Sequence, residues 1–547
     1  MSRLDRIHET ARRDGAISRR TLLGWGATLA ALPLLNGRAT GAVLGRVRFA
    51  GDPFTLGVAS GDSTDSGVVL WTRLAPSPFE PGGGMPPGAA VEVAWEVATD
   101  EAMSKVVRRG TAVATPQLGH SVHVEAEGLE PDRWYWYRFR AGDASSRVGR
   151  ARTLPAAASS PDQLRFAFCS CSHFEQGHFT AYGHMAQEEV DLIFHLGDYI
   201  YEGSGERVVR EGREPRPDTR VRKHLGREIM TLDDYRIRHA QYKSDPHLQA
   251  AHARCPWFVT WDDHEVENNY ANAVAEEVRE GETKLNPADF LIRRAAAYQA
   301  YYEMMPLRPA SLPQGPKMQL YRRASFGRLA ELMVLDTRQY RTDQPNNDKL
   351  APLNEAATNP EATILGVEQK AWLESRLIAS PGTWNVLAQQ VMMGMVDVRP
   401  TEPGEQFSMD QWPGYAHERV ELGQFLENRR VLNPVVLTGD IHSNWVNDLH
   451  VDDRKSDSPA VATEFVVTSI TSGGNGSDEA ANREVLKGAN PNLRYYNRQR
   501  GYVRCTVTPR DWRSDYMVVD KVTEPDSAIH KTASFVVEAG RPGAQPV

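Results

Sequence analysis

The pattern of hydrophobic and polar positions along the chain changes near residue 160. Before that point, segments such as "VEVAWEV" and "SVHVEAEGL" alternate between apolar and polar residues, which is typical of half-buried antiparallel strands. Beyond it, short continuous apolar runs alternate with stretches of helical pattern. This order predicts an N-terminal β-domain followed by a layered α/β domain.

The alternating region, residues 48–153, is predicted to form a small β-sandwich. Its segment "GLEPDRWYWYRFR" has a turn followed by alternating aromatic residues, and it resembles the tyrosine-corner segment of fibronectin type III sandwiches. The small, proline-punctuated stretch "TLPAAASSPDQ" predicts a linker over residues 154–163. We therefore expect a fibronectin type III-like domain, joined by this linker to an α/β domain over residues 164–547.

The α/β region contains several strong strand candidates. One of them, "LIFHL" over residues 192–196, is apolar except for His195, which suits an interior strand of a parallel sheet covered on both faces. The others are "LRFAFCSC", "CPWFVTWDDHE", "LAELMVLDTRQY", "WNVLAQQVMM" and "NPVVLTGDIH", with further strands beyond Tyr502. Helices are predicted over "TAYGHMAQEEV", residues 295–305 and "VEQKAWLESRL".

Four of these strands end in residues that bind metals. The endings hold Cys171, then Asp198 and Tyr201, then residues 262–265, and finally Asp440 and His442. A single aspartate after a strand is commonly a turn former or a helix cap, so one such ending would predict little. Ligands of open α/β sheets bind beyond the carboxyl ends of strands, and four such endings together predict a site at one edge of a sheet.

The N-terminus predicts export. Arg19 and Arg20 precede an apolar run over residues 22–35, and small residues around 40–42 suit cleavage, so residues 1–42 resemble a twin-arginine signal peptide. The run of about 14 apolar residues is shorter than the roughly 20 that span a bilayer, which favours export over a membrane anchor. We expect the twin-arginine machinery to deliver the protein to the periplasm or the exterior.

Composition and charge narrow the function classes. The 547 residues are 41% hydrophobic and 24% charged, with a formal net charge of −8. These values are typical of a soluble protein with more than one domain, and they predict no specific nucleic-acid partner. Four cysteines are too few for a disulfide framework in a secreted chain of this length. Cys169 and Cys171 lack the spacing of a zinc knuckle, although one cysteine can bind a metal by itself.

The motifs resemble a known family. "GDYIY" is similar to the Gly-Asp-x-x-Tyr motif of purple acid phosphatases, in which the aspartate bridges two metals and the tyrosine binds ferric iron. The fuller set resembles the alkaline phosphatase D (PhoD) family of metallophosphoesterases; it consists of "CSCSHFEQGHFTAYGHM", "HLGDYIYEG", "WDDHEVENNY", "LDTRQYR" and "LTGDIHSNW". The resemblance covers nearly the whole mature chain and implies a calcineurin-like α/β metallophosphoesterase domain after the sandwich.

The resemblance implies a ferric site. Its ligands would be Cys171, Asp198, Tyr201 and His442, with the thiolate at the place where other metallophosphoesterases have an aspartate. A thiolate, a carboxylate, a phenolate and an imidazole bring several negative charges to one ion, which favours Fe³⁺ over a divalent metal.

The resemblance also implies a second metal, bridged to the first by Asp198. Asp263 and Asp440 stand where purple acid phosphatases have asparagine and histidine. The strand "TWNVLAQQV" offers Gln389 or Gln390 where they place another histidine. Hard oxygen donors favour Ca²⁺ or Mg²⁺ over zinc, so we expect Ca²⁺. The sequence leaves open whether Asp262 or a glutamine takes part.

Three residues are predicted to act on the substrate. By resemblance, His264 would hydrogen-bond the phosphate and protonate the leaving alkoxide; the alternative is a histidine that only orients a metal-binding aspartate. Asn269 and Arg338 are predicted phosphate contacts, and a structural salt bridge is an equal alternative for Arg338. The lone histidines at 173, 178 and 184 are expected at the surface or in the core.

The predicted reaction is hydrolysis of phosphate monoesters or diesters. A metal-bound hydroxide would attack phosphorus in line, without a covalent phosphoenzyme. One alternative is a phospholipase D type phosphodiesterase acting on phospholipids, with Trp412 and Trp445 either lining a lipid wall or lying in the core. More remote alternatives are an iron redox enzyme and a surface binding module whose metal domain is inactive.

Overall fold

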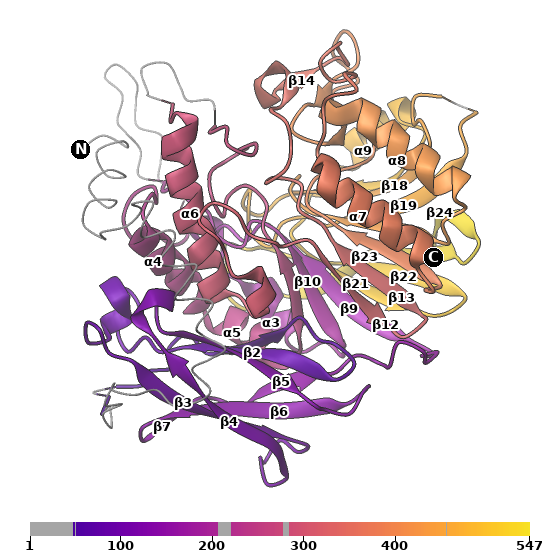
Figure 1. Ribbon diagram of the computed structural model, residues 1–547. Coiled ribbons are helices and arrows are strands. Elements are labelled where there is room, and N and C mark those ends of the chain that lie inside the picture. The colour runs from indigo at the N-terminus through magenta and orange to yellow at the C-terminus, as the bar shows by residue number, and fades with distance from the viewer. Residues whose placement is uncertain (1–47, 50, 206–219, 277–283, 456) are drawn as a thin grey trace.

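The computed structural model describes residues 48–49, 51–205, 220–276, 284–455 and 457–547. The predicted export signal, residues 1–42, lies outside the described residues. Two large mixed sheets lie face to face, with helices on their outer surfaces and the N-terminal strands at one end (Figure 1).

The larger sheet has ten strands and contains the first three predicted α/β strands. Its order is β24-β23-β22-β21-β9-β10-β11-β1-β2-β5. The bounds are β1 Val58–Gly61, β2 Gly67–Arg73, β5 Ser121–Glu127, β9 Leu164–Cys169, β10 Leu192–Leu196, β11 Trp257–Thr260, β21 Gly501–Val507, β22 Asp511–Val519, β23 Ile529–Glu538 and β24 Arg541–Pro546. Strand β10 pairs in parallel with β9 and β11, which confirms the interior parallel strand predicted from its apolar run.

The second sheet has seven strands in the order β12-β13-β15-β17-β19-β18-β20. The bounds are β12 Arg322–Phe326, β13 Ala330–Val334, β15 Trp384–Ala388, β17 Pro434–Thr438, β18 Asn444–His450, β19 Ala460–Val466 and β20 Leu493–Asn497. Strands β13, β15, β17 and β19 run parallel. A short pair, β14 (Leu350–Ala351) with β16 (Phe407–Ser408), lies apart from both sheets.

Alternation along the strands explains the layers. Phe166 and Phe168 of β9 pack between the two sheets against residues such as Val386. Ala167 and Cys169, on the opposite face of the same strand, pack against the helices, because successive side chains of a strand point to opposite faces. The helices on this face are α3 (Thr180–Met185), α4 (Leu232–Lys243), α5 (Pro246–Arg254) and α6 (Pro287–Met304). Helices α7 (Gly366–Ala379) and α8 (Ala416–Asn428) cover the outer face of the seven-stranded sheet, and α9 spans Ala480–Ala489.

The N-terminal region is β-rich and is bonded directly into the larger sheet. A five-stranded sheet contains β3 (Val91–Ala98), β4 (Val106–Ala114), β6 (Trp134–Ala141), β7 (Ala144–Ser145) and β8 (Gly149–Arg152). It shares one apolar core with strands β1, β2 and β5. Those three strands continue the ten-stranded sheet, because Gly61 of β1 pairs with Trp257 of β11. The Tyr135 hydroxyl accepts a hydrogen bond from the Glu130 backbone N–H at 2.9 Å, at the predicted corner.

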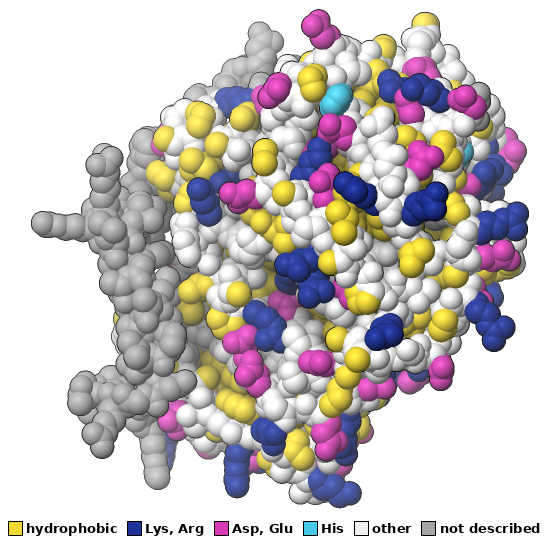
Figure 2. All heavy atoms as spheres, turned by 45° about the vertical axis from the view of Figure 1, so that its right-hand side comes forward, with side chains coloured by type: hydrophobic (Ala, Val, Ile, Leu, Met, Phe, Trp, Pro, Cys, Tyr) yellow, Lys and Arg dark blue, Asp and Glu magenta, His cyan; other side chains and the backbone are white. Residues whose placement is uncertain are grey.

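Two observations bear on partners. Basic and acidic side chains are intermixed over the face shown in Figure 2, where no extended basic patch appears among the described residues. None of the helices in the described ranges has the length and apolar character needed to cross a bilayer.

Candidate metal centre

The predicted ligands meet between the carboxyl ends of strands from both sheets. Cys171, Asp198 and Asp263 follow β9, β10 and β11 of the ten-stranded sheet, whereas Asp440 and His442 follow β17 of the seven-stranded sheet. The prediction of a site at one edge of a single sheet is therefore wrong. The two stacked sheets each contribute strand ends, and the ligands lie where those ends come together.

Several of these residues have an unusual backbone. The φ angle is 59° at Cys171, 56° at Asp198, 62° at Asp440, 55° at His442 and 49° at Asn269. Such left-handed conformations in non-glycine residues cost of order 1–3 kcal/mol each and cluster at functional sites. All of these residues except Asn269 supply ligand atoms to the clusters described below.

The four predicted iron ligands come together. Ligand atoms of Cys171, Asp198 and His442 lie within 4.8 Å of one another. The Tyr201 hydroxyl donates to Asp198 Oδ2 at 2.8 Å and lies 3.1 Å from His442 Nε2. Burial, together with the neighbouring Asp198 carboxylate, raises the pKa of both the Cys171 thiol and the Tyr201 phenol well above their usual values. Both groups would bind a cation in their ionised forms, and the cation would offset the desolvation cost of ionising a buried group.

A second cluster consists of oxygen donors. Carboxylate oxygens of Asp198, Asp262, Asp263 and Asp440 lie within 4.8 Å of one another, so Asp262 stands among the candidate ligands. Burial and like charges raise the pKa of Asp198 and Asp262 well above the usual carboxyl value, and that of Asp440 to about 6. Asp198 Oδ1 and Asp262 Oδ2 are buried without a hydrogen-bond donor. Crowded carboxylates with unpartnered oxygens fit a hard cation.

The side chains of the two glutamines that directly follow β15 are engaged in hydrogen bonds. Gln390 Oε1 accepts hydrogen bonds from the backbone N–H and the hydroxyl of Thr337, at 3.0 and 2.7 Å. Gln389 Oε1 accepts from Trp412 Nε1 at 3.2 Å. Both amides are fully buried and bridge neighbouring strand ends, which favours a supporting role over the metal ligation that the sequence left open.

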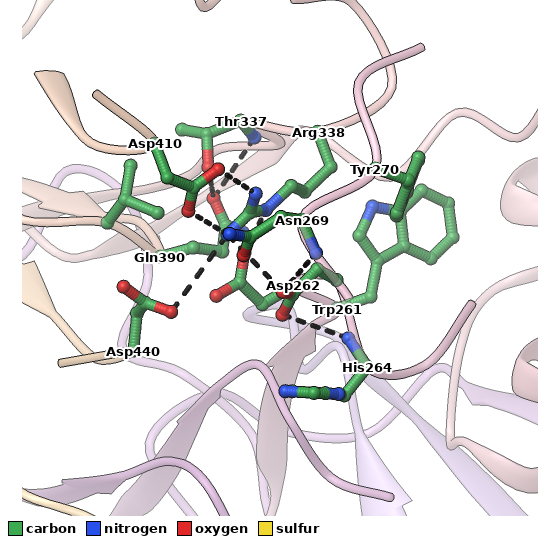
Figure 3. A network of polar contacts seen from close by, with 12 residues as sticks. Trp261, Asp262, His264, Asn269, Tyr270, Thr337, Arg338, Gln390, Asp410 and Asp440 are labelled. Carbon is green, nitrogen blue, oxygen red and sulfur yellow. Dashed lines mark hydrogen bonds and ion pairs between the residues drawn. The ribbon is translucent and has the colours of Figure 1, made fainter. Parts of the chain in front are cut away.

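Arg338 lies in a buried network of carboxylates (Figure 3). Its guanidinium donates to Asp262 Oδ1 at 2.5 Å and to both oxygens of Asp410, at 2.6 and 2.8 Å. It also lies 3.9 Å from one oxygen of Asp263 and 3.9 Å from one oxygen of Asp440. The side chain is fully buried, and these contacts favour the structural salt bridge over the direct phosphate contact considered for Arg338. Its guanidinium holds the carboxylate cluster in place.

His264 is paired with a carboxylate that the sequence analysis did not single out. Its Nδ1 lies 2.7 Å from Glu202 Oε2, and one of its ring nitrogens lies within 4.8 Å of oxygens of Asp198 and Asp263. Burial lowers the pKa of His264, but the carboxylates of Glu202, Asp263 and Asp198 outweigh burial and raise that pKa well above the usual value. In the metal-free protein these carboxylates therefore favour the protonated form of His264, whose ring faces the cluster.

Asn269 belongs to the same turn. Its backbone N–H donates to Asp263 Oδ2 at 2.7 Å, and its carbonyl accepts from Gln344 Nε2 at 2.7 Å. The structure therefore shows a positioning contact to Asp263 through the backbone. Its side chain is half-buried at the cluster.

Other supporting residues had weak signals or none in the sequence. Glu202 and Glu265 directly follow Tyr201 and His264, and this adjacency was the available signal. Glu265 accepts from the backbone N–H groups of Tyr199 at 2.6 Å and Asp262 at 2.9 Å, which ties the turns after β10 and β11 together. Asp410 had no signal, because it follows no predicted strand.

The remaining predictions for single residues have mixed outcomes. The ring of His173 packs against that of Tyr201 at a tilt of 38°, with ring centroids 4.3 Å apart, which makes it part of the site. His178 and His184 are half-buried, and His184 Nε2 lies 2.8 Å from the Ser527 carbonyl. Trp412 and Trp445 are buried, so the core alternative holds for both and they line no lipid wall.

Comparisons with known proteins agree with these motifs. A family model described as PhoD-like phosphatase matches residues 166–516, and one described as its N-terminal domain matches residues 39–155. Alkaline phosphatase D of Bacillus subtilis is 53% identical over 500 residues, which cover 91% of this chain and 83% of that protein. A solved structure titled "Structure of PhoD" has 52% identity and a TM-score of 0.85, covering 92% of this chain and 93% of that chain.

Proposed function

This chain belongs to the PhoD-like phosphatase family, and from that premise we propose that it is an exported phosphate-ester hydrolase with a two-metal centre. Support comes from the 53% identity with an alkaline phosphatase D and from the carboxylate cluster that lies beside a thiol, a phenol and an imidazole. We further propose that the two stacked sheets form a calcineurin-like metallophosphoesterase fold and that residues 48–153 form a fibronectin type III-like domain before a linker.

The donor sets suggest which residues would hold which metal. Cys171, Asp198, Tyr201 and His442 would hold Fe³⁺, and Asp198 would also contribute to a Ca²⁺ site with Asp263 and Asp440. When bound, the two cations would supply Lewis-acid stabilisation of the phosphate oxygens and an activated water for attack on phosphorus.

The protein's own groups would then move the proton and orient the substrate. His264, held protonated by Glu202, would donate a hydrogen bond to the phosphate and then its proton to the leaving alkoxide. The Asn269 side chain would hydrogen-bond a phosphate oxygen, and Arg338 would act through the carboxylates that it positions. No side chain needs to form a covalent bond to phosphorus.

The single observation that carries the proposal is the convergence of the two ligand clusters on Asp198. We expect protein exported in its native host to contain iron and calcium and to show a visible tyrosinate-to-iron charge-transfer band. Elemental analysis and an absorption spectrum test this, and removal of the metals by chelation should abolish activity and colour together. Colourless, active protein holding only zinc or magnesium would contradict the metal assignment.

The substrate class requires a separate measurement. We expect hydrolysis of a phosphate monoester and a diester, and little release of choline from a phosphatidylcholine dispersion. The physical reason is that the two tryptophans considered for a lipid wall are buried. Faster turnover of the phospholipid than of either soluble ester would favour the phospholipase D type alternative.

Changing Glu202 to glutamine should shift the pH dependence of turnover. The Glu202 carboxylate raises the pKa of His264, so Glu202→Gln should lower that pKa and move the alkaline limb of the kcat/KM profile to lower pH. Activity above that limb should fall about 10–100-fold, as is typical for partners that orient site residues. A profile that keeps its alkaline limb would show that Glu202 does not control His264.

A further inference from the structure

A glycine-rich loop contacts the candidate metal centre, although none of its residues belongs to the two ligand clusters. We define the glycine loop as residues 471–476, "TSGGNG", between β19 and α9. Gly473, Gly474 and Gly476 have φ angles of 87°, 69° and 69°. A Cβ at Gly473 would lie 2.5 Å from Arg500 Nη2, so both the left-handed backbone and the close approach of this arginine call for glycine.

The glycine loop is held by one buried arginine. Arg500 Nε donates to the Gly474 carbonyl at 2.8 Å, and its Nη2 donates to the Gly473 carbonyl at 3.2 Å. Its Nη1 donates to the carbonyl of His442. The guanidinium therefore joins the glycine loop to the turn that carries a predicted iron ligand.

Within the loop, Ser472 is bonded to two other predicted iron ligands. Its hydroxyl lies 2.6 Å from the Tyr201 hydroxyl and 2.9 Å from the Cys171 carbonyl. Ser472 is buried, so no solvent competes for these contacts. Through Ser472 and Arg500, the glycine loop touches three of the four predicted ligands of the iron site.

The number of hydroxyl hydrogens available determines the direction of the hydrogen bond between Ser472 and Tyr201. The Tyr201 hydroxyl donates its single hydrogen to Asp198 Oδ2 at 2.8 Å, so in its contact with Ser472 it can only accept. The serine also has one hydrogen, and the Cys171 carbonyl and the Tyr201 oxygen compete for it. When Tyr201 loses its proton to bind a cation, its oxygen becomes an anionic acceptor and the stronger competitor.

We infer that Ser472 is a positioning residue for Tyr201. Its hydroxyl donates a hydrogen bond to the phenolate oxygen, fixes the direction of that oxygen, and limits the electron density that the phenolate gives to the metal. Arg500 and the glycines hold Ser472 at this point. The inference rests on the proposed iron site and adds a residue that neither metal cluster contains.

The test compares variants of the full, metal-loaded protein. Without the hydrogen bond, the phenolate electrons are less stabilised, so Ser472→Ala should move the charge-transfer band to longer wavelength. The variant should also lose iron to a chelator about 10–100-fold faster, by the usual effect of such partners on metal affinity. Turnover should fall mainly in kcat, with little change in KM. Ser472→Thr keeps the hydroxyl and should restore the band of the unmodified protein.

A matched control separates this role from the loss of any buried hydroxyl. Ser514 is fully buried in β22, where it bonds Trp512 Nε1 at 3.0 Å, so Ser514→Ala should lower stability without moving the band. If Ser472→Ala does not fold, Ser472→Cys keeps the side-chain size with a weaker donor and should give the same direction of shift.

The outcomes distinguish this inference from the proposed function. Unmodified protein with no iron band would overturn the iron assignment and the role of Ser472 with it. Unmodified protein with the band, and an Ser472→Ala variant with the same band and the same rate of iron loss, would overturn the role of Ser472 alone.

Discussion

Asp198→Asn is expected to abolish phosphate-ester hydrolysis. Asp198 belongs to all three groups of closely spaced ligand residues, so the substitution removes a charged donor from both predicted metal sites. Two-metal centres supply several kcal/mol of transition-state stabilisation, and about 1.4 kcal/mol corresponds to a tenfold change in rate. We expect kcat/KM for para-nitrophenyl phosphate to fall by ~10³-fold or more, with loss of bound metal in elemental analysis.

The same variant should not unfold the metal-free protein. Burial and Asp263 raise the pKa of Asp198, so the metal-free fold loses stability as pH rises from the ordinary carboxyl pKa to the raised one, and the full cost is present at higher pH. An amide removes this cost, and the Tm of the metal-free variant at alkaline pH should equal or exceed that of the unmodified protein. Loss of activity with an unchanged or higher Tm identifies a functional rather than a structural residue.

Asp191→Asn is the matched control. Asp191 is a buried aspartate at the opposite end of strand β10, where it accepts from the Arg165 backbone N–H at 2.8 Å and pairs with Arg152. Its substitution should lower stability and leave kcat/KM and metal content unchanged. An Asp198→Asn variant that keeps its metals and most of its activity would overturn the assignment of Asp198 as the shared ligand.

His264→Gln is expected to slow hydrolysis in a way that depends on the leaving group. A general acid contributes about 10²–10⁴-fold when the leaving group needs a proton, so kcat for an alkyl phosphate should fall by that factor. The leaving phenolate of para-nitrophenyl phosphate is stable without a proton, so its hydrolysis should fall much less. Steady-state kinetics on the two esters measure the difference.

His184 provides a control for the His264 variant. His184→Gln changes a half-buried histidine that bonds the Ser527 carbonyl and should leave both rates unchanged. Equal losses on the two esters would assign His264 to binding or to orientation of Asp263 rather than to proton transfer. That result would favour the alternative role considered for this histidine.

The strand endings show how much of the site the sequence contained. Each short continuous apolar run predicted a strand buried on both faces, and the ligand residues follow β9, β10, β11 and β17 as expected. The position of Asp198 after β10 and of His442 after β17 is therefore a local property of the chain. The family resemblance then grouped these endings into one site.

The contacts between endings depended on the tertiary structure. Glu202 pairs with His264 because two turns of the larger sheet lie side by side. Arg338 follows β13 of the seven-stranded sheet and pairs with Asp262 after β11 of the ten-stranded sheet, and also with Asp410. Ser472 reaches Tyr201 from 271 residues further along the chain. The hydrophobic pattern of a segment reports which of its own faces is buried, and it carries no record of which other segment lies opposite.

The sequence by itself determined the strands, the turn after each of them and the residues offered at those turns. Only the tertiary structure decided that two stacked sheets share the site and that the side chains of Gln389 and Gln390 hydrogen-bond neighbouring strand ends. It also brought Ser472 of the glycine loop within hydrogen-bond distance of the Tyr201 hydroxyl. The physical reason is that side-chain partners at the site are set by the stacking of the sheets, which brings together segments that lie far apart in the chain.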